Sequence, residues 1–547
     1  MDLPSPFSQK GNISLLSCSQ IGDESAMENT SWTSIALRNP LILDQILAQL
    51  DITELKKARL VCRSWREIGG SLLGKRTMLC ISKLFYYDGC KLCVTPVASN
   101  LMRRITIPTH HKFDDSIPTR KKPNVIIKVF KDLAHQLQFT REIIFHVHQR
   151  KSENAFITGL RRNLKNIQHI SLQVGWDRYK PSPSSGVSPA YTKNLAVLTK
   201  LTSINFVLGE IIDTYPAHSL LQFLIDSAPN LKYLKGRSWL YPSLERCKNL
   251  KMLHFQNTVP STSPTDVNLI GAIKMLGHVK DSLIEMVLLC PNGRDTVVDM
   301  SQLNQSLDLP VMSKLTSLSI RPAAEFMFHD FFNEDYLPVL TTVLLQVKHT
   351  SDRLNVSAYL NLWKGHRGIK YFRLELEEEW QNVGANVIGR KIVRVFPSVT
   401  KFDLRAWLGE DIVIQAIEQM MTPYQKWELE DVSVTGDHVT KSSVLVAVLK
   451  NVVRWKGAYS IFFASAKHVH FEDTLVQQRE FSLHIHELIS NSEGCTGVKI
   501  CGGYNRSVQE MLQLLGPIFE GSGTPIRMYG ECGSHTGRTP CLLKSLL

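Results

Sequence analysis

The chain has 547 residues, which allows about three or four domains of ordinary size, or one small module joined to a long repeat array. Hydrophobic residues make up 43% of the chain and charged residues 21%, and this composition excludes a wholly disordered, collagen-like or coiled-coil protein. The formal net charge is +13, so the charge permits an acidic partner without identifying it.

The sequence carries no recognisable targeting or membrane segment. Its apolar runs are shorter than the roughly 20 residues that span a hydrocarbon core. The first residues include Asp2 and an early proline and lack a basic and then apolar signal pattern. Eleven cysteines, an odd number spread along the chain, predict reduced thiols. We therefore expect a soluble cytoplasmic or nuclear protein.

Residues 1–32 are rich in Ser, Asn and Gly and predict a disordered leader. A helix is predicted directly after it, because Asn39 can cap a helix and Pro40 suits the first helical position. The apolar residues that follow recur at helical spacing. They are Leu43, Ile46, Leu47 and Leu50.

A second helix is predicted to begin at an acidic, cap-like start formed by Asp51 and Glu54. The glycine pair Gly69-Gly70 is expected to end it. One apolar face of this helix would consist of Leu55, Ala58, Cys62 and Trp65. About 45 residues with this much apolar surface are too few to bury all of it alone.

The stretch NPLILDQILAQLDITELKKARLVCRSWREIG resembles the F-box, the motif that docks onto the Skp adaptor of cullin-RING ubiquitin ligases. The pattern L…RLVC..W in its second half is the specific part of the resemblance. The usual Leu-Pro-x-Glu start is replaced by Asn-Pro-Leu-Ile, which we expect to alter contacts at the rim of the adaptor interface. The alternative is a helical cap that packs only on its own chain. The resemblance implies an F-box at residues 33–72 and adaptor binding by Pro40, Leu43, Ile46, Leu47, Leu50, Leu55, Leu60, Val61, Cys62 and Trp65.

Residues 73–135 contain two proline-bounded segments and predict a connector. Its basic run, Arg120-Lys121-Lys122 with Lys128 and Lys131, lacks the interleaved aromatic residues of a nucleic-acid stacking platform. We interpret the run as a solvated linker.

Residues 136–505 carry a recurrent string of four apolar residues spaced three, three and two apart. The third residues of five successive strings, at positions 318, 343, 372, 402 and 432, differ by 25, 29, 30 and 30 residues. Incomplete versions lie around Leu234, Met286, Val469 and Val498, and a helix-length stretch such as SLLQFLIDSAPNL precedes some strings. Complete strings span Leu164–Leu172, Leu198–Phe206, Cys247–Phe255, Met312–Ile320, Leu337–Leu345 and Phe396–Leu404.

A period near 30 with a short Leu-x-Leu strand resembles the leucine-rich-repeat family, although the regular Asn of the better-known consensus is missing. The fold class that follows is α/β: a small N-terminal helical F-box and then an irregular leucine-rich-repeat solenoid of horseshoe shape. Residues 506–547, with a glycine cluster from Gly521 to Gly537, predict a C-terminal cap and a flexible tail.

Strand side chains alternate between faces, so a column of polar residues is predicted on the face opposite the solenoid core. A phosphorylated target would suit Arg321, Arg373 and Arg405 if these residues lie close together. The candidate target-binding residues are His254, Arg321, Tyr371, Arg373, Glu375, Lys401, Asp403 and Arg405.

The known catalytic motifs are missing, among them the nucleophile elbow, the phosphate-binding loop and the dinucleotide fingerprint. We therefore expect no catalytic residue and no cofactor.

Histidine pairs such as His146 with His148, His468 with His470 and His484 with His486 have a spacing that can chelate a metal, but exposed strand histidines are the preferred interpretation. The Cys90-x-x-Cys93 pair lacks the second half of a zinc motif. No metal is expected.

These patterns together predict a non-catalytic substrate receptor of an SCF-type ubiquitin ligase. Its expected partners are a Skp-family adaptor, a cullin-RING ligase reached through the adaptor, and an unidentified protein target. One alternative is a non-degradative F-box and repeat scaffold. Another is a basic solenoid that binds nucleic acid, which would lose affinity steeply with salt.

Overall fold

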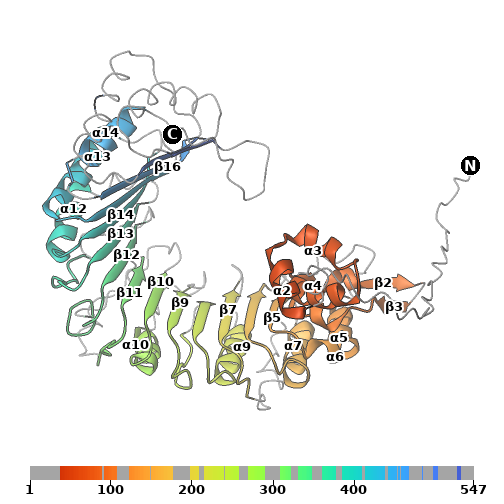
Figure 1. Ribbon diagram of the computed structural model, residues 1–547. Helices are drawn as coiled ribbons and strands as arrows, with labels where there is room; N and C mark the ends of the chain where they lie inside the picture. The colour runs from red at the N-terminus through yellow and green to blue at the C-terminus, as the bar shows by residue number, and fades with distance from the viewer. Residues whose placement is uncertain are drawn as a thin grey trace, which may run out of the picture. The chain divides into compact units, whose positions relative to one another are not determined.

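The computed structural model describes two compact units, residues 1–78 and residues 79–547 (Figure 1). The described residues are 37, 39–88, 91–107, 122–147, 150–175, 197–208, 215–238, 241–257, 269–289, 308–321, 331–347, 360–376, 385–408, 413–437, 442–452, 454–455, 458–466, 483, 497–502 and 527–530. The predicted leader, residues 1–32, lies outside them.

The first unit contains the helices α2 (Pro40–Gln49), α3 (Ile52–Ala58) and α4 (Arg63–Arg76). The predicted start of the first helix is confirmed, because the Asn39 side chain accepts a hydrogen bond from the Leu41 amide at 3.0 Å and Pro40 occupies the first helical position. The predicted start at Asp51 is confirmed as well. Asp51 and Glu54 form a reciprocal capping box, in which the Glu54 amide donates to the Asp51 carboxylate at 2.8 Å.

The course predicted for the second helix is wrong. The chain leaves the helix after Ala58 and begins a new one, α4, at Arg63. Gly69 and Gly70 do not end it, because they are buried inside α4. A Cβ at Gly69 would lie 2.7 Å from Cγ of Arg59, so the missing side chain allows the end of α3 to approach α4 closely.

The last residue of α4 ties the unit together. Arg76 donates hydrogen bonds to the carbonyls of Ala48 and Leu50, the latter at 2.6 Å, and so satisfies acceptors at the C-terminal end of α2. Both α2 and α3 pack on α4. The buried apolar side chains of the unit are those of Leu43, Leu47, Leu55, Ala58, Leu72 and Leu73.

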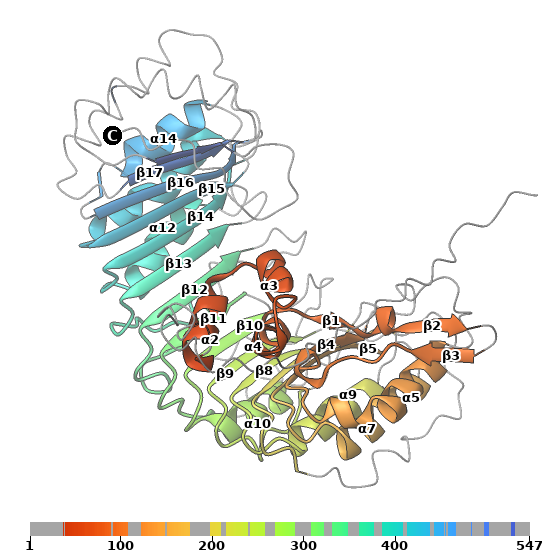
Figure 2. The ribbon, with the colours of Figure 1, turned by 45° about the vertical axis from the view of Figure 1, so that its right-hand side comes forward.

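The second unit is built on a sixteen-stranded parallel sheet, in which β1 is followed by β4 to β18 in chain order (Figure 2). A separate antiparallel hairpin pairs β2 (Phe85–Asp88) with β3 (Lys91–Val94). The strands of the sheet are β1 (Leu79–Cys80), β4 (Arg104–Ile107), β5 (Glu142–Val147), β6 (His169–Val174), β7 (Ser203–Leu208), β8 (Tyr233–Ser238), β9 (Met252–Asn257), β10 (Glu285–Leu289), β11 (Ser317–Ile320), β12 (Thr342–Val347), β13 (Tyr371–Leu376), β14 (Lys401–Trp407), β15 (Asp431–Asp437), β16 (Ala458–Ala466), β17 (Gly497–Gly502) and β18 (Arg527–Gly530).

Helices alternate with many of these strands and cover one face of the sheet (Figures 1 and 2). Long helices fill this layer in some repeats, whereas the described residues between β8 and β9, 241–251, form turns. The helices among the described residues of this unit are α5 (Lys122–Asp132), α6 (Ala134–Leu137), α7 (Arg150–Arg162), α9 (Tyr215–Asp226), α10 (Leu269–Val279), α12 (Ala385–Val395), α13 (Ile414–Met421) and α14 (Ser442–Val452), with 3-10 turns η1 (Ile81–Leu84), η2 (Ser99–Leu101) and η8 (Thr422–Lys426). None of the helices that the structure describes is long and apolar enough to cross a membrane.

The predicted apolar repeat is confirmed as the buried row of the sheet. The third residues of five successive strings, Leu318, Val343, Phe372, Phe402 and Val432, are paired in register from β11 to β15 and are at most 1% exposed. Burial alternates along each of the strands β12 and β13, so the residues between the buried ones lie on the opposite face.

A continuous backbone ladder runs along the amino ends of the strands. The Arg103 carbonyl accepts hydrogen bonds from the amides of Arg141 at 2.8 Å and Glu142 at 3.1 Å. The Arg141 carbonyl accepts in the same way from Gln168 and His169, and the pattern continues to the turn before β15. Each turn is therefore held directly beside the turn of the next repeat.

Three predicted boundaries differ from the structure. β1 and β4 belong to the sheet, so the sheet begins well before residue 136, and α5 occupies part of the predicted solvated linker. There Lys128 forms an ion pair with Asp132 at 3.6 Å and donates to the Leu92 carbonyl, which gives the helix a contact with the hairpin. β18 adds a strand inside the predicted flexible tail, because its backbone pairs with β17. The incomplete string predicted around Val469 lies outside the described residues.

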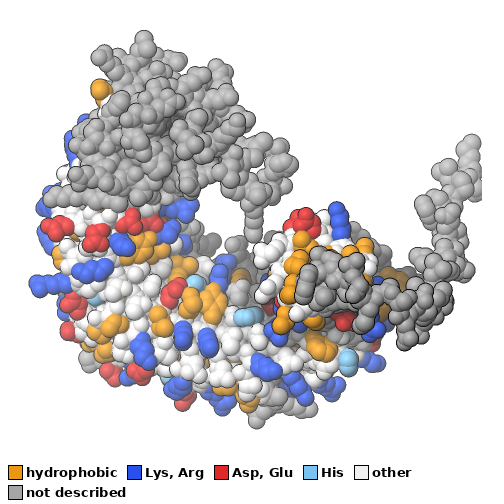
Figure 3. All heavy atoms as spheres, viewed as in Figure 1, with side chains coloured by type: hydrophobic (Ala, Val, Ile, Leu, Met, Phe, Trp, Pro, Cys, Tyr) orange, Lys and Arg blue, Asp and Glu red, His pale blue; other side chains and the backbone are white. Residues whose placement is uncertain are grey.

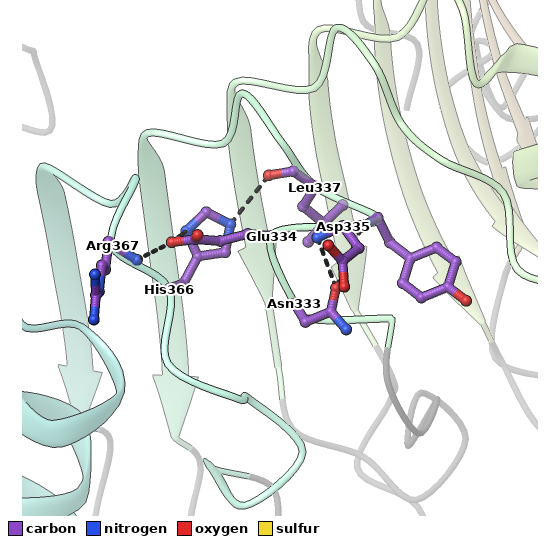
Figure 4. A network of polar contacts seen from close by, with 7 residues as sticks. Asn333, Glu334, Asp335, Leu337, His366 and Arg367 are labelled. Carbon is purple, nitrogen blue, oxygen red and sulfur yellow. Dashed lines mark hydrogen bonds and ion pairs between the residues drawn. The ribbon is translucent and has the colours of Figure 1, made fainter.

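A buried histidine joins two neighbouring repeats (Figure 4). His366 is 0% exposed, and its Nε2 lies 3.1 Å from the Leu337 carbonyl oxygen. Its Nδ1 lies 3.9 Å from a carboxylate oxygen of Glu334, which also accepts a hydrogen bond from the Arg367 amide. Burial lowers the pKa of His366, although the Leu337 carbonyl and Glu334 act in the opposite direction. Neutral His366 with its proton on Nε2 fits these contacts.

We expect Gly159→Ala and Gly277→Ala to have opposite effects on stability, although both lie inside helices. A Cβ at Gly159 in α7 would lie 2.1 Å from the ring of Phe130 in α5, whereas a Cβ at Gly277 in α10 would have no atom within 4 Å. Overpacking should cost about 1–3 kcal/mol in the first variant. The second variant should be stabilised by about 0.5–1 kcal/mol, because alanine gives the unfolded chain less conformational entropy to lose on folding than glycine does. Urea unfolding of both variants beside wild type checks this, and equal shifts would contradict the packing of α5 on α7.

We expect His366 to make stability depend on pH. Its pKa is lower in the folded state than the unfolded value of about 6.5, so the contribution is fully present above that value and is lost as the pH falls toward the folded pKa. Between about pH 7.5 and pH 5.5, wild type should lose up to about 1 kcal/mol more stability than His366→Gln. Urea midpoints at the two pH values measure this difference. His218 and His278, whose pKa values burial also lowers, remain in both proteins and cancel.

Candidate functional site

The helical unit leaves large apolar side chains at its surface, and Figure 3 shows hydrophobic side chains gathered over these helices. Leu60 is 80% exposed and Val61 65%, in the turn between α3 and α4. On α2, Leu41 is 77% exposed and Ile46 41%. An apolar surface of this kind on so small a unit is typical of a protein interaction site.

The structure divides the ten predicted adaptor-binding residues into three groups. Pro40, Ile46, Leu60, Val61 and Cys62 are exposed, and Leu50 and Trp65 are half-buried. Each of the remaining residues is 0% exposed and packs inside the helical unit, so it belongs to the core of the fold, and its contact with an adaptor stays a prediction. These residues are Leu43, Leu47 and Leu55.

Sequence reasoning missed three exposed apolar residues, which are Leu41, Ile42 and Ile52. Ile42 and Ile46 are four residues apart on α2 and therefore share a face of that helix. The signal that could have found Leu41 and Ile42 is the same apolar periodicity, if it is interpreted as two apolar faces of α2 instead of one. We name Leu41, Ile42, Ile46, Leu60 and Val61 the exposed apolar set.

Charged side chains on the sheet face opposite the helices form a network across β12 to β14. Arg373 lies 2.6 Å from a carboxylate oxygen of Glu375 and 3.4 Å from one of Asp403. Gln346 donates to Glu375 at 2.7 Å, and the Tyr371 hydroxyl donates to Asp403 at 3.3 Å. These contacts bring together four of the predicted target-binding residues: Tyr371, Arg373, Glu375 and Asp403.

The environment of this network shifts two pKa values. Burial raises the pKa of Asp403, while the charge of Arg373 and the hydrogen bond from Tyr371 act in the opposite direction. Burial also raises the pKa of Tyr371, and the charge of Asp403 adds to this effect. Tyr371 is therefore held as a neutral hydrogen-bond donor beside a half-buried carboxyl group.

A second, smaller network lies on β8 to β10. His254 Nε2 lies 3.0 Å from a carboxylate oxygen of Glu285, and its Nδ1 lies 3.5 Å from the Tyr233 hydroxyl. Burial raises the pKa of Tyr233, and the charge of Glu285 adds to the effect. His254, another predicted target-binding residue, is thus already engaged by its neighbours on both strands.

The hypothesis that Arg321, Arg373 and Arg405 form one cationic cluster is wrong. Arg373 contacts two carboxylates, and the register places Arg405 opposite Glu375. Arg321 donates to Gln346 at 3.4 Å. Positive and negative side chains alternate across these strands, because cross-strand neighbours of opposite charge attract. Lys401 and Arg405 are exposed at this face.

No group of three or more histidine, cysteine or acidic residues that could hold a metal occurs among the described residues. His146 and Cys93 are described, but their predicted partners His148 and Cys90 are not. The pairs His468 with His470 and His484 with His486 also lie outside the described part of the chain.

Comparison with known proteins bears on the helical unit. No curated protein sequence matches the chain. The family model of the F-box domain matches residues 39–76, which include all of α2, α3 and α4. The match ends at Arg76, the residue that caps α2, four residues beyond the predicted boundary at residue 72. Residues 39–76 are therefore an F-box domain.

Proposed function

We propose that this chain is a substrate receptor of an SCF-type ubiquitin ligase. In this proposal, the F-box domain binds a Skp-family adaptor and thereby joins a cullin-RING ligase, and the second unit holds a protein target. The observation that carries it is the F-box domain at residues 39–76, whose folded helices still expose large apolar side chains. Burial of this surface by an adaptor would supply the free energy of docking.

The exposed apolar set suits a docking surface for a second reason. The helices α3 and α4 also carry exposed cations, including Lys56, Lys57 and Arg66. An apolar centre with a charged rim is the usual anatomy of a protein interface. An adaptor with an acidic rim would be attracted to these cations.

For the second unit, we propose an irregular leucine-rich-repeat solenoid of horseshoe shape. The chain order of the strands, their parallel pairing and the row of buried residues in register support this proposal. Repeats of unequal length, with helices in some and turns in others, account for the irregular period. The target would bind the polar face of the sheet, where the networks of Arg373 and His254 and the exposed Lys401 and Arg405 lie.

The proposed mechanism is proximity. A receptor that holds a target on one unit and the adaptor on the other raises the local concentration of target lysines near the conjugating enzyme. Under this proposal the chain contributes no reacting group, and it acts in the cytoplasm or nucleus. Cys247 fits a reducing compartment without reacting there, because burial raises the pKa of its thiol to about 12.

We expect Ile46→Asp and Leu60→Asp each to weaken adaptor binding at least about tenfold, because each would place a carboxylate in an apolar interface. The assay is binding of the purified full chain to a purified Skp adaptor. Val339→Asp is the matched control, since Val339 is 41% exposed, as is Ile46, but belongs to the second unit. Equal binding by all three variants would contradict the assigned docking surface.

A substitution at a buried position distinguishes loss of adaptor binding from loss of the folded domain. Leu47→Asp should unfold the F-box domain, because the side chain is 0% exposed and its carboxylate would have no partner there. Circular dichroism should show lost helix for Leu47→Asp but native spectra for Ile46→Asp and Leu60→Asp. Native helix content in the Leu47 variant would contradict the core described for α2 to α4.

We also expect proteins captured by wild type to live longer in cells that express the Ile46→Asp, Leu60→Asp double variant. The double variant keeps the target surface but should not recruit the ligase, so bound targets should escape ubiquitin transfer. The measurement is the half-life of captured proteins with and without proteasome inhibition. Unchanged half-lives together with intact adaptor binding by wild type would favour a non-degradative scaffold.

A further inference from the structure

A basic pocket lies at the amino ends of strands β4 to β7, away from the polar networks described above. It has a volume of about 440 Å³, within the range of small-ligand sites. Three of its lining residues are cations, Arg103, Arg141 and Lys200, and none is acidic. The remaining lining residues are Ser99, Asn100, Phe139, Asn166 and Gln168.

The backbone ladder brings the two arginines together. Arg103 and Arg141 occupy the same position in successive turns, and the Arg141 amide donates to the Arg103 carbonyl at 2.8 Å. Their side chains therefore start about 5 Å apart, the spacing of neighbouring strands. Burial lowers the pKa of Arg103, and the charge of Arg141 adds to the effect, as expected of two guanidinium groups that repel each other.

The carboxylate closest in sequence does not neutralise this pair. Glu142 is held by Arg104 through two contacts, at 2.7 Å from Nε and at 3.2 Å from Nη2. That ion pair lies on the first residues of β4 and β5, one residue beyond the pocket arginines. No acidic partner of Arg103 or Arg141 occurs among the described residues, so two arginine forks are available to an acceptor from outside.

The other lining residues complete a site for a small anion on an organic stem. Lys200 Nζ donates to Asn166 Oδ1 at 2.6 Å, and Asn166 is itself fixed by a 2.7 Å hydrogen bond to the Gln138 carbonyl. The ammonium group is thus held at the pocket by the neighbouring turn. Phe139, which is 44% exposed, adds an apolar wall.

We propose that this pocket binds the phosphate group of a phosphorylated side chain in the protein target, with Arg103, Arg141 and Lys200 as the phosphate ligands. A phosphate monoester carries close to two negative charges and several acceptor oxygens, which two guanidinium forks and one ammonium group match in charge and geometry. Phe139 would contact the carbon part of the phosphorylated side chain. Lys232 and Lys251 continue the row of cations along the same edge outside the pocket, so binding that depended equally on these lysines would indicate a longer polyanion such as a nucleic acid.

A phosphate site for the target rests on the proposed function as a substrate receptor. It adds to that function a chemical feature, a phosphorylated side chain, by which the target would be recognised. It also differs from the alternating charges on β11 to β14. There arginines and carboxylates neutralise one another across the strands, whereas the pocket gathers cations without an acid.

The test measures retention of degenerate peptides with a fixed central phosphoserine, phosphothreonine or phosphotyrosine on the full chain in complex with its adaptor. The same peptides without phosphate are the reference. We expect at least about tenfold preference for the phosphorylated peptides, because each charge-assisted fork contributes strongly. Equal retention of both peptide sets would overturn the proposal.

Two double variants distinguish binding in the pocket from general attraction to the positive charge of the chain. Arg103→Gln with Arg141→Gln should abolish the preference for phosphopeptides. Lys232→Gln with Lys251→Gln is the matched control, because these lysines occupy the same position in two other successive turns, are exposed and do not line the pocket. Both double variants remove two positive charges. Equal losses in the two variants would mean that binding is unspecific attraction, and the proposal would fail.

A further arm distinguishes the source of the phosphate. Inorganic phosphate should compete with phosphopeptides more strongly than chloride at equal ionic strength. The line width of the ³¹P resonance of inorganic phosphate is measured in the presence of wild type and of the arginine double variant. If only wild type broadens the resonance and no phosphopeptide is retained, the pocket binds a small free phosphate and the target proposal is wrong. Adaptor retention, measured on every sample, shows separately whether the proposed ligase function fails.

Discussion

The register of the parallel strands controls the rest of the second unit. Because side chains alternate with a period of two, a slip of one residue would turn every buried side chain of a strand to the solvent face. The pairing of Leu318, Val343, Phe372 and Phe402 in one continuous row prevents such a slip, since each side chain is buried against its neighbours in the adjacent repeats. The helices and turns between strands vary in length without disturbing this row, because they pack outside it.

The same register decides the chemistry of the exposed face. It places Arg373 opposite Asp403 and Glu375 opposite Arg405, so the charges on β13 and β14 largely satisfy one another. A partner that binds there must compete with existing ion pairs, or contact the exposed Lys401 and Arg405 around them. At the amino ends of β4 and β5 the register acts differently. It sets Arg104 beside Glu142 and leaves Arg103 beside Arg141, which concentrates positive charge in one pocket.

The apolar residues of the F-box domain fall into two groups, one in the core and one at the surface. Leu43, Leu47 and Leu55 are buried in its core, and Arg76 caps the C-terminal end of α2. Leu60 and Val61 stay exposed because the chain leaves the helix after Ala58 and turns toward α4. The apolar surface available for docking is thus produced by the interruption between α3 and α4 and by the second face of α2.

Local patterns in the sequence determined the features that depend on near neighbours. The capping groups Asn39 and Asp51, the near-30-residue period and the alternation of strand side chains between two faces were predicted, because caps and strand faces follow from residues a few positions apart. Only the tertiary structure decided which F-box leucines are core, that β1, β4 and β18 extend the sheet, and that Arg103 meets Arg141. These features depend on contacts between residues far apart in the chain, such as the 38-residue separation of Arg104 and Glu142, and no local periodicity encodes such contacts.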